Sequence, residues 1–267
     1  MAYFNSFPLV PYYFGNEKTF TYFENIGVYV DLLDQIVDDV SFYNYYTIID
    51  GDRPDTVSYK FYDTTDYHWT FYLLNQNLRE CGWPLTLDQV EERAKEYYPN
   101  YAVQIDGTHT TNTVTDSSVL GKRLQIGTEV SINSGAAVAT VISRNLDIGQ
   151  IILKYKSGTE SALTSISEIT YSNGLPSPSD EAYVFSAAAG TNFYNNVVEY
   201  NAPHHYENNG AMVDIDPFDL TTAIAGATPV TNYEYYQEEN DGNKQIRVLK
   251  PDVIRRVAQE FNRLVRS

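Results

Sequence analysis

The start of the chain is apolar but follows neither the helical nor the strand period. Residues 3–14 are mostly aromatic or aliphatic, and Pro8 and Pro11 interrupt them. Proline lacks the backbone N–H that a helix interior or a central strand requires. The pattern therefore predicts an extended arm or an edge strand. An arm this apolar must be covered either by its own domain or by a neighbouring subunit.

Helical spacing begins with residues 29–40. Apolar residues lie three or four positions apart, and aspartates occupy the positions between them: Val30, Leu33, Ile36, Val37 and Val40, with Asp31, Asp34 and Asp38. This spacing predicts an amphipathic helix.

The segment 45–98 has the most regular pattern in the chain. The β-rich run 45–49 predicts a strand, which the turn residues 50–52 close. A helix is expected to begin at Pro54 with Asp52 as its cap, because proline is favoured in the first helical turn. Further helices are expected over 67–76, stopped by Asn75-Gln-Asn77, and over 87–97, capped by Thr86.

Short β segments separated by turn residues follow a polar stretch. Residues 100–120 are rich in Thr, Ser, Asn and Asp and indicate a linker. Four strands are then expected, at 128–132, 138–143, 150–155 and 166–171, and their close spacing is typical of a small closed or half-open barrel. Residues 173–230 hold few periodic stretches, which predicts an extended, loop-rich segment that needs a partner to be ordered.

The end of the chain is regular again. Residues 233–237 and 245–249 are strand-like, and Asp241-Gly242 between them predicts a hairpin. A helix is expected after Pro251, with one wide apolar face that must dock on something. Arginines occupy the rest of its surface: Arg255, Arg256, Arg263 and Arg266.

Charge and composition narrow the possible partners. The net charge is −17, yet residues 243–267 carry seven Lys or Arg against two Asp or Glu. An acidic body repels phosphate, which argues against nucleic acid as a ligand. The basic end fits either an acidic protein surface or a solvated helix face. The 24 tyrosines fit either interfaces or cross-strand pairs.

The sequence offers little material for catalysis or metal binding. It has no phosphate loop, GxGxxG, GxSxG or HExxH pattern, and Cys81 is its single cysteine. His204-His205 with Asp214 and Asp216 are the best metal candidates, but adjacent residues of a strand point to opposite faces, so surface histidines are the default. No secretory signal or apolar run long enough for a membrane span occurs. We expect no enzyme, no cofactor, no metal site, no membrane contact and a chain made in the cytoplasm.

Two stretches carry a resemblance to a known module. Tyr45-Tyr-Thr-Ile-Ile-Asp-Gly-Asp-Arg-Pro-Asp-Thr-Val-Ser-Tyr-Lys-Phe-Tyr62 and Tyr67-His-Trp-Thr-Phe-Tyr-Leu-Leu-Asn-Gln-Asn77 resemble a LysM module. In LysM modules that bind glycans, two loops form a groove for N-acetylglucosamine polymers. The resemblance places these loops near 51–53 and 75–78. The chain departs from the module at Asp52-Arg53-Pro54 and at Trp83-Pro84, where a long helix replaces the short closing strand.

The departures resemble a second family, the LysM-like baseplate wedge subunits of contractile-tailed phages of the T-even type. The matching motifs stand in the family's order: Tyr3–Pro8, Asp50–Asp55, His68–Phe71, Gly82–Leu85 and Tyr233–Pro251. The resemblance implies a non-enzymatic structural protein of the virion tail baseplate, which clamps neighbouring wedge proteins around the hub. Implied partners are other wedge subunits, sheath or tube initiators and hub proteins. Glycan binding to peptidoglycan or chitin is the alternative.

The expected fold is α+β: a LysM-like core with an inserted small β-barrel, and extended N- and C-terminal arms ending in a helix. The expected division is an arm and helix at 1–40, a LysM-like domain at 41–100, a linker at 101–120, a barrel insertion at 121–172, and an extended segment, hairpin and basic helix at 173–267. Candidate interface residues are Tyr3, Phe4, Phe7, Tyr12, Tyr13, Arg53, Trp69, Trp83, Tyr235, Arg255, Phe261 and Arg263.

Overall fold

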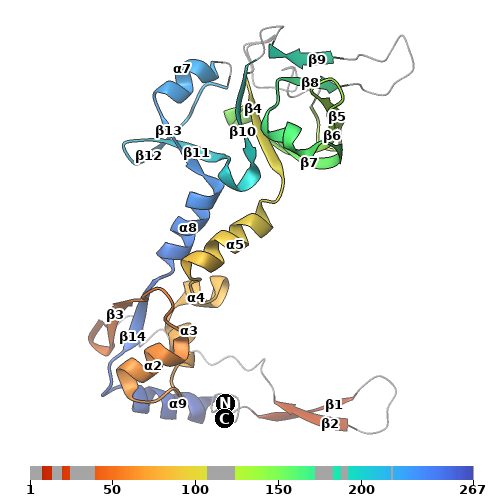
Figure 1. Cartoon of the computed structure of the whole chain (residues 1–267). Helices are drawn as coiled ribbons and strands as arrows, with labels where there is room; N and C mark the ends of the chain where they lie inside the picture. Colours follow the sequence, from red (N-terminus) through yellow and green to blue (C-terminus); the bar gives the residue numbers. More distant parts are fainter. Residues whose placement is uncertain are drawn as a thin grey trace. The chain divides into compact units, whose positions relative to one another are not determined.

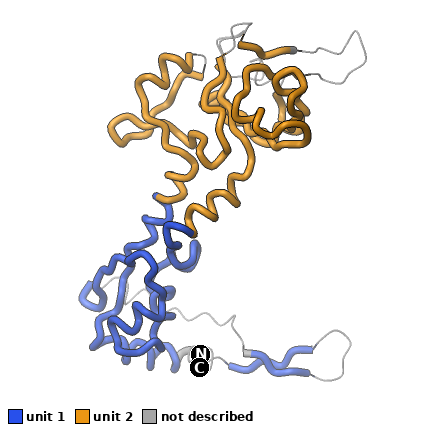
Figure 2. Tube along the Cα trace, in the orientation of Figure 1, with its two compact units in different colours: residues 1–88, 238–267 blue, residues 89–237 orange. Residues whose placement is uncertain are grey.

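The computed structural model describes residues 8–13, 20–24, 40–106, 124–171, 183–187, 192–217 and 219–266. The chain forms two units, the first made of residues 1–88 and 238–267 and the second of residues 89–237 (Figure 2). Both helices and sheets contribute to the described part, so the fold is α+β, as predicted. The candidates Tyr3, Phe4 and Phe7 and the expected helix residues 29–39 lie outside the described residues.

The first unit contains a two-stranded sheet that packs against helices. Strand β3 (Tyr43–Thr47) pairs antiparallel with β14 (Gln245–Leu249), with Tyr46 opposite Ile246. Helices α2 (Pro54–Tyr62), α3 (Trp69–Leu74) and α4 (Gln76–Cys81) follow β3 in the chain (Figure 1). The first unit is therefore closed by a strand that follows the whole second unit in sequence.

Apolar side chains from distant parts of the sequence fill the core of the first unit. One buried cluster joins the strands to the helices and consists of Ile48, Val57, Phe71, Leu78, Ile246 and Val248. Helix α9 (Ile254–Arg266) buries Ile254, Val257, Ala258 and Phe261. The expected docking of the terminal apolar face is confirmed, and its cover is the chain's own first unit.

The expected stop at Asn75 is confirmed, because α3 ends at Leu74 and Asn75 is its C-cap in an extended conformation, although a further helix, α4, begins at the next residue. Two other local predictions are wrong. Arg53 rather than Asp52 stands at the N-cap of α2, and the Asp52 carboxylate instead accepts hydrogen bonds from Tyr46 and Lys60. Residues 233–237 are not a strand, because they belong to helix α8 (Asn232–Gly242).

The start of α8 explains the error over residues 233–237. The Thr231 hydroxyl accepts a hydrogen bond from the Glu234 backbone N–H, while the Glu234 carboxylate accepts from the Thr231 N–H and hydroxyl. This reciprocal capping box fixes a helix start. Strand β14 consequently pairs with β3 instead of forming a hairpin with residues 233–237.

The main sheet of the second unit has seven antiparallel strands in the order β10-β4-β7-β6-β5-β8-β9. Four of them confirm the predicted β segments: β5 (Glu129–Ile132), β6 (Ala137–Asn145), β7 (Gln150–Gly158) and β8 (Glu168–Tyr171). The others are β4 (Tyr101–Ile105), β9 (Tyr183–Ser186) and β10 (Phe193–Val198). The sheet thus draws strands from outside the stretch expected to form a barrel.

Strand β4 corrects the linker prediction. It is a run of five residues with Ala102, Val103 and Ile105 fully buried, and it pairs with both β7 and β10. The Thr- and Asn-rich tract that suggested a linker begins only after it, and residues 107–120 lie outside the described part of the chain.

A smaller sheet completes the second unit and corrects the prediction of a loop-rich segment at 173–230. Strand β11 (Pro203–Asn208) pairs with β12 (Ala211–Val213) and β13 (Thr228–Thr231), and helix α7 (Leu220–Ala225) lies between β12 and β13 in the chain. These elements share a buried apolar cluster of Ile148, Tyr206, Ile215 and Leu220. The segment therefore has a core of its own.

The remaining elements are one long helix, a hairpin and short 3-10 turns. Helix α5 (Leu87–Tyr97) confirms the expected helix there and buries Val90 and Ala94. Strands β1 (Leu9–Tyr13) and β2 (Phe20–Glu24) form an antiparallel hairpin, which confirms the edge-strand alternative for residues 9–13. The 3-10 turns among the described residues are Val40–Phe42, Leu146–Ile148, Glu160–Thr164 and Glu199–Asn201.

Candidate functional site

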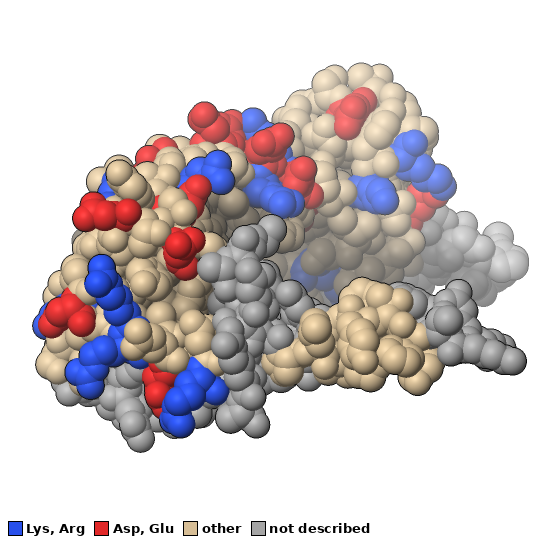
Figure 3. Space-filling model, turned by 90° about the horizontal axis from the view of Figure 1, so that it is seen from below, with Lys and Arg blue, Asp and Glu red and all other residues tan. Residues whose placement is uncertain are grey.

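The β1–β2 hairpin exposes large apolar side chains on both of its faces. Successive residues of a strand point to opposite sides, so a hairpin packed on a core buries every second residue. Here every side chain described in the two strands is exposed, and the large apolar ones retain 42% to 62% of their accessible surface: Leu9, Val10, Tyr12, Tyr13, Phe20, Tyr22 and Phe23. The described atoms of this hairpin form a continuous surface without charged side chains in Figure 3.

Ring contacts organise this aromatic hairpin. Tyr12 meets Phe23 edge-to-face with ring centroids 6.2 Å apart, and Tyr13 meets Phe20 at 5.7 Å. Such pairs contribute about 0.5–1.5 kcal/mol each beyond the area that they bury. An isolated two-stranded hairpin is only marginally stable in water, so these contacts hold the strands together without removing their apolar surface from solvent.

The sequence prediction named two of the seven exposed apolar residues of this hairpin. It named Tyr12 and Tyr13 on β1 but omitted Phe20, Tyr22 and Phe23 on β2. A signal for them exists, because Phe20-Thr-Tyr-Phe23 is a dense aromatic run like Tyr12-Tyr-Phe14. Aromatic density in both segments is the sequence signal of this surface.

Three of the other candidate interface residues contribute to packing within the chain. Trp69 is 9% exposed and contacts Phe261, which is 3% exposed, with ring centroids 4.7 Å apart. Trp83 is half-buried and its indole Nε1–H donates to the Asp52 backbone carbonyl at 2.7 Å. These three residues stabilise the first unit.

The remaining candidates lie on separate elements. Arg53 has a largely exposed side chain that pairs with Asp55 at 3.3 Å, and Arg255 is exposed on α9. Arg263 pairs with Glu260 on the same helix. Tyr235 stacks on His204 with ring centroids 3.9 Å apart. No common cluster unites these four residues with the aromatic hairpin among the described contacts.

Asp52 lies in the first loop that the LysM resemblance predicts as a groove wall. Its carboxylate is already hydrogen-bonded within the protein. The Tyr46 hydroxyl donates to one Asp52 carboxylate oxygen at 2.7 Å, and Lys60 Nζ donates to both. Burial by itself would raise the pKa of Asp52, but the hydrogen bonds from Lys60 and Tyr46 outweigh it and hold the pKa below its usual range.

The second stretch that the resemblance predicts to be a loop, residues 75–78, is instead helical from Gln76, where α4 begins. Its polar side chains are hydrogen-bonded within the protein as well. The Asn75 side chain donates to the carbonyls of Phe71 and Arg247 and accepts from the Arg247 N–H at 2.8 Å. Asn77 donates to the Asn243 side chain at 3.2 Å. Residues of the C-terminal segment thus bond to the polar side chains of this stretch.

The histidine pair adopts an arrangement that strand geometry did not predict. The Nδ1 atoms of His204 and His205 are 3.0 Å apart, because a β-bulge at Pro203/His205 breaks the regular alternation of β11. His205 Nε2 lies 3.3 Å from a Glu207 carboxylate oxygen. Within the described residues, no group of three or more His, Cys, Asp or Glu is placed to hold a metal ion.

Comparison of the chain with protein-family models, curated proteins and solved structures finds no match. In the described part of the chain, every helix is too short or too polar to span a bilayer.

Proposed function

We propose that this protein is a non-enzymatic structural subunit of a multi-protein assembly, held in place by insertion of the aromatic hairpin into neighbouring subunits. The single observation that carries the proposal is the exposure of large apolar side chains on both faces of this hairpin. Contiguous apolar surface of this kind on a soluble protein marks an interaction site.

The size of the exposed surface fits a protein partner. An aromatic side chain buries about 150–250 Å² when it is fully covered, so five rings that are about half exposed offer on the order of 500 Å². Leu9 and Val10 add to this area. A stable interface buries about 800 Å² on each partner. The hairpin alone therefore supplies most of one partner's share.

The assembly that we propose is the baseplate wedge of a contractile phage tail. The support is the ordered set of motifs from Tyr3–Pro8 to Tyr233–Pro251 that resembles the wedge subunit family. The succession of β3, α2, α3 and the pairing strand β14 is compatible with a LysM-like core. In this proposal the partners are other wedge subunits, sheath or tube initiators and hub proteins.

Glycan binding is the competing proposal, and the contacts of the two predicted groove walls weigh against it. Asp52 and Asn75 already bond to other parts of the first unit. A polar ligand gains little from groups whose hydrogen bonds are satisfied within the protein. Titration with chitin or peptidoglycan oligomers tests this proposal, and micromolar binding abolished by Asn77→Ala would favour it.

Assembly with hairpin variants tests the structural role. We expect Tyr12→Ser combined with Phe23→Ser to reduce incorporation into tail particles at least about tenfold, because two ring contacts with the partner are lost. The matched control is Tyr59→Ser, which removes a tyrosine that is 60% exposed on α2 of the same unit. Full incorporation of the double variant, with both proteins folded by circular dichroism, would refute the proposal.

A further inference from the structure

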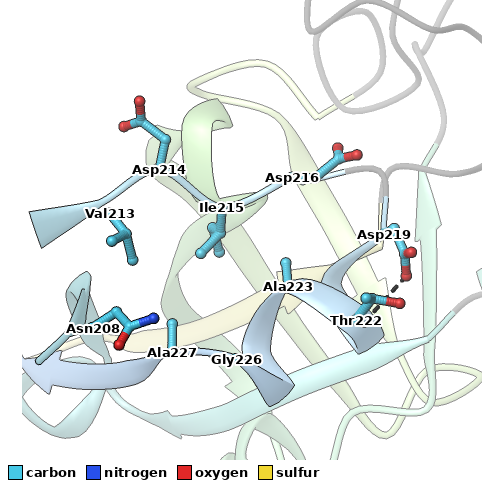
Figure 4. Close-up of a pocket in the computed structure, with 10 residues that line it drawn as sticks. All are labelled: Asn208, Val213, Asp214, Ile215, Asp216, Asp219, Thr222, Ala223, Gly226 and Ala227. Atoms are coloured by element: carbon cyan, nitrogen blue, oxygen red, sulfur yellow. Dashed lines mark hydrogen bonds between the residues drawn. The ribbon is translucent and has the colours of Figure 1, made fainter.

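A groove in the second unit lies between residues 213–216 and helix α7. It encloses about 420 Å³. Figure 4 shows the Val213 and Ile215 side chains directed toward Ala223 and Ala227 across this space. Because alanines line the α7 side, the two walls do not meet, and the groove stays open between them.

The groove floor is continuous with a buried core. Ile215 belongs to the cluster that includes Tyr206 and Leu220, and Val213, Ala223 and Ala227 pack against that cluster while remaining partly exposed. An aliphatic side chain placed in the groove would extend this cluster toward the surface. Such burial is favourable by about 0.8 kcal/mol for each methylene group.

The rim of the groove is acidic. The carboxylates of Asp214 and Asp216 point away from the floor in Figure 4, while Asp219 accepts a hydrogen bond from the Thr222 backbone N–H and caps α7. Residues 89–237 carry 17 Asp or Glu against seven Lys or Arg. Charge complementarity therefore favours a cationic occupant at the rim over a neutral or anionic one.

The placement of the apolar and acidic side chains favours a peptide segment as the occupant. The floor is apolar and the acidic residues lie at the rim, so a segment that presents an aliphatic and a basic side chain together matches both. In contrast, the carboxylates do not converge on the cavity as they would around a polar small molecule.

We infer that this groove docks a segment of a partner protein, which places an aliphatic side chain on the floor and a Lys or Arg beside Asp214. This docking surface is separate from the aromatic hairpin and goes beyond the proposed function. With both surfaces occupied, the chain connects two partner segments of different chemistry: one accepts aromatic rings, and the other contributes a basic and an aliphatic side chain.

The test uses the full-length protein and a labelled synthetic peptide of alternating lysine and valine, six residues long, as the probe. Methyl NMR spectra of Ala-, Ile- and Val-labelled protein locate the binding site. We expect shift changes at Val213, Ile215, Ala223 and Ala227. Absence of binding, or changes confined to other methyl groups, would overturn the inference.

Two variants and one control refine the test. Asp214→Lys should weaken peptide binding at least about fivefold, because it reverses the rim charge. Ala223→Leu should abolish binding by filling the groove, with stability retained because leucine extends the apolar cluster. Glu92→Lys reverses an exposed charge on α5 in the same unit and should leave affinity unchanged. Equal affinity of Asp214→Lys and Glu92→Lys would contradict the inference.

The hairpin variants separate the two claims. Tyr12→Ser combined with Phe23→Ser leaves the groove intact, so we expect the peptide to bind this double variant as it binds the wild type. Failure of particle incorporation with unchanged peptide binding would support both proposals. Loss of peptide binding in this variant would place the probe on the hairpin and overturn the groove inference alone.

Discussion

The hydroxyl of Tyr62 donates a hydrogen bond to the backbone carbonyl of Leu249 at 2.9 Å, across 187 residues of sequence. This contact ties the end of α2 to the last residue of β14. It belongs to the packing by which the C-terminal segment completes the core of the first unit. Burial raises the pKa of Tyr62 above the ordinary value for a tyrosine.

Alkaline unfolding should reveal the role of Tyr62. A raised pKa in the folded state means that this group's stabilising contribution is present below about pH 10 and is lost as the pH rises above that value. Tyr62→Phe should cost about 1 kcal/mol at neutral pH, yet lose less stability than the wild type between pH 9 and 11. Urea unfolding at several pH values measures both effects. Parallel pH profiles would contradict this assignment.

Acid unfolding should depend on Asp52, whose pKa is held below its usual range. A depressed folded-state pKa stabilises the protein above the unfolded value of about 4, and this contribution disappears as the pH falls through the folded-state pKa. Asp52→Asn should therefore be less stable than the wild type at pH 7, with the gap closing toward pH 2. Asp55→Asn, at an exposed ion pair, is the control and should change little.

Asn75 should be the most sensitive polar residue of the first unit. Its side chain satisfies both the N–H and the carbonyl of Arg247 on β14 and is buried. Asn75→Ala should lower the free energy of unfolding by about 3 kcal/mol, because buried backbone groups lose their partners. Asn77→Ala removes a single side-chain bond at 3.2 Å and should cost about 1 kcal/mol. Equal costs would show that the Asn75 bridge has no special role.

Two glycines of the second unit with positive φ angles offer a matched pair. Gly158 and Gly135 have φ angles of +96° and +93°, but a Cβ at Gly158 would lie 2.5 Å from the Ala136 carbonyl oxygen, whereas at Gly135 it would meet nothing within 4 Å. Gly135→Ala should cost about 1 kcal/mol through backbone strain alone. Gly158→Ala should cost at least about 3 kcal/mol, because a steric clash adds to the same strain. Thermal unfolding compares the two variants, and similar melting temperatures would contradict the expected clash.

Local sequence signals predicted most elements but not their long-range pairing. The run Gln245–Leu249 was correctly predicted to be a strand, yet its expected partner was wrong. Asp241-Gly242 is a local hairpin signal, whereas the true partner β3 is distant in sequence and is chosen by burial of Ile246 and Val248. The capping signal at Thr231 and Glu234, which sets α8, was present in the sequence and outweighs the strand-like composition of residues 233–237.

The candidate site was predictable to a similar extent. An apolar arm broken by proline indicated an uncovered surface, and Tyr12 and Tyr13 are indeed exposed on the hairpin. The sequence could not show that Trp69 and Phe261 are buried whereas Tyr12 and Tyr13 are exposed. An aromatic residue type does not reveal which residues its ring packs against. The contact between Trp69 and Phe261 joins α3 to α9, which are distant in sequence. The groove beside α7 forms because the fold places Val213 and Ala227 on opposite sides of it. No local sequence pattern predicts that arrangement.

Hydrogen exchange of the hairpin amides, in the free protein and in the assembled particle, tests the central claim most directly. The account predicts rapid amide exchange of residues 9–13, except Pro11, and of residues 20–24 in the free protein. After assembly, exchange should be at least about a hundredfold slower, because a neighbouring subunit then covers both faces. Equal exchange rates in the two states would contradict it.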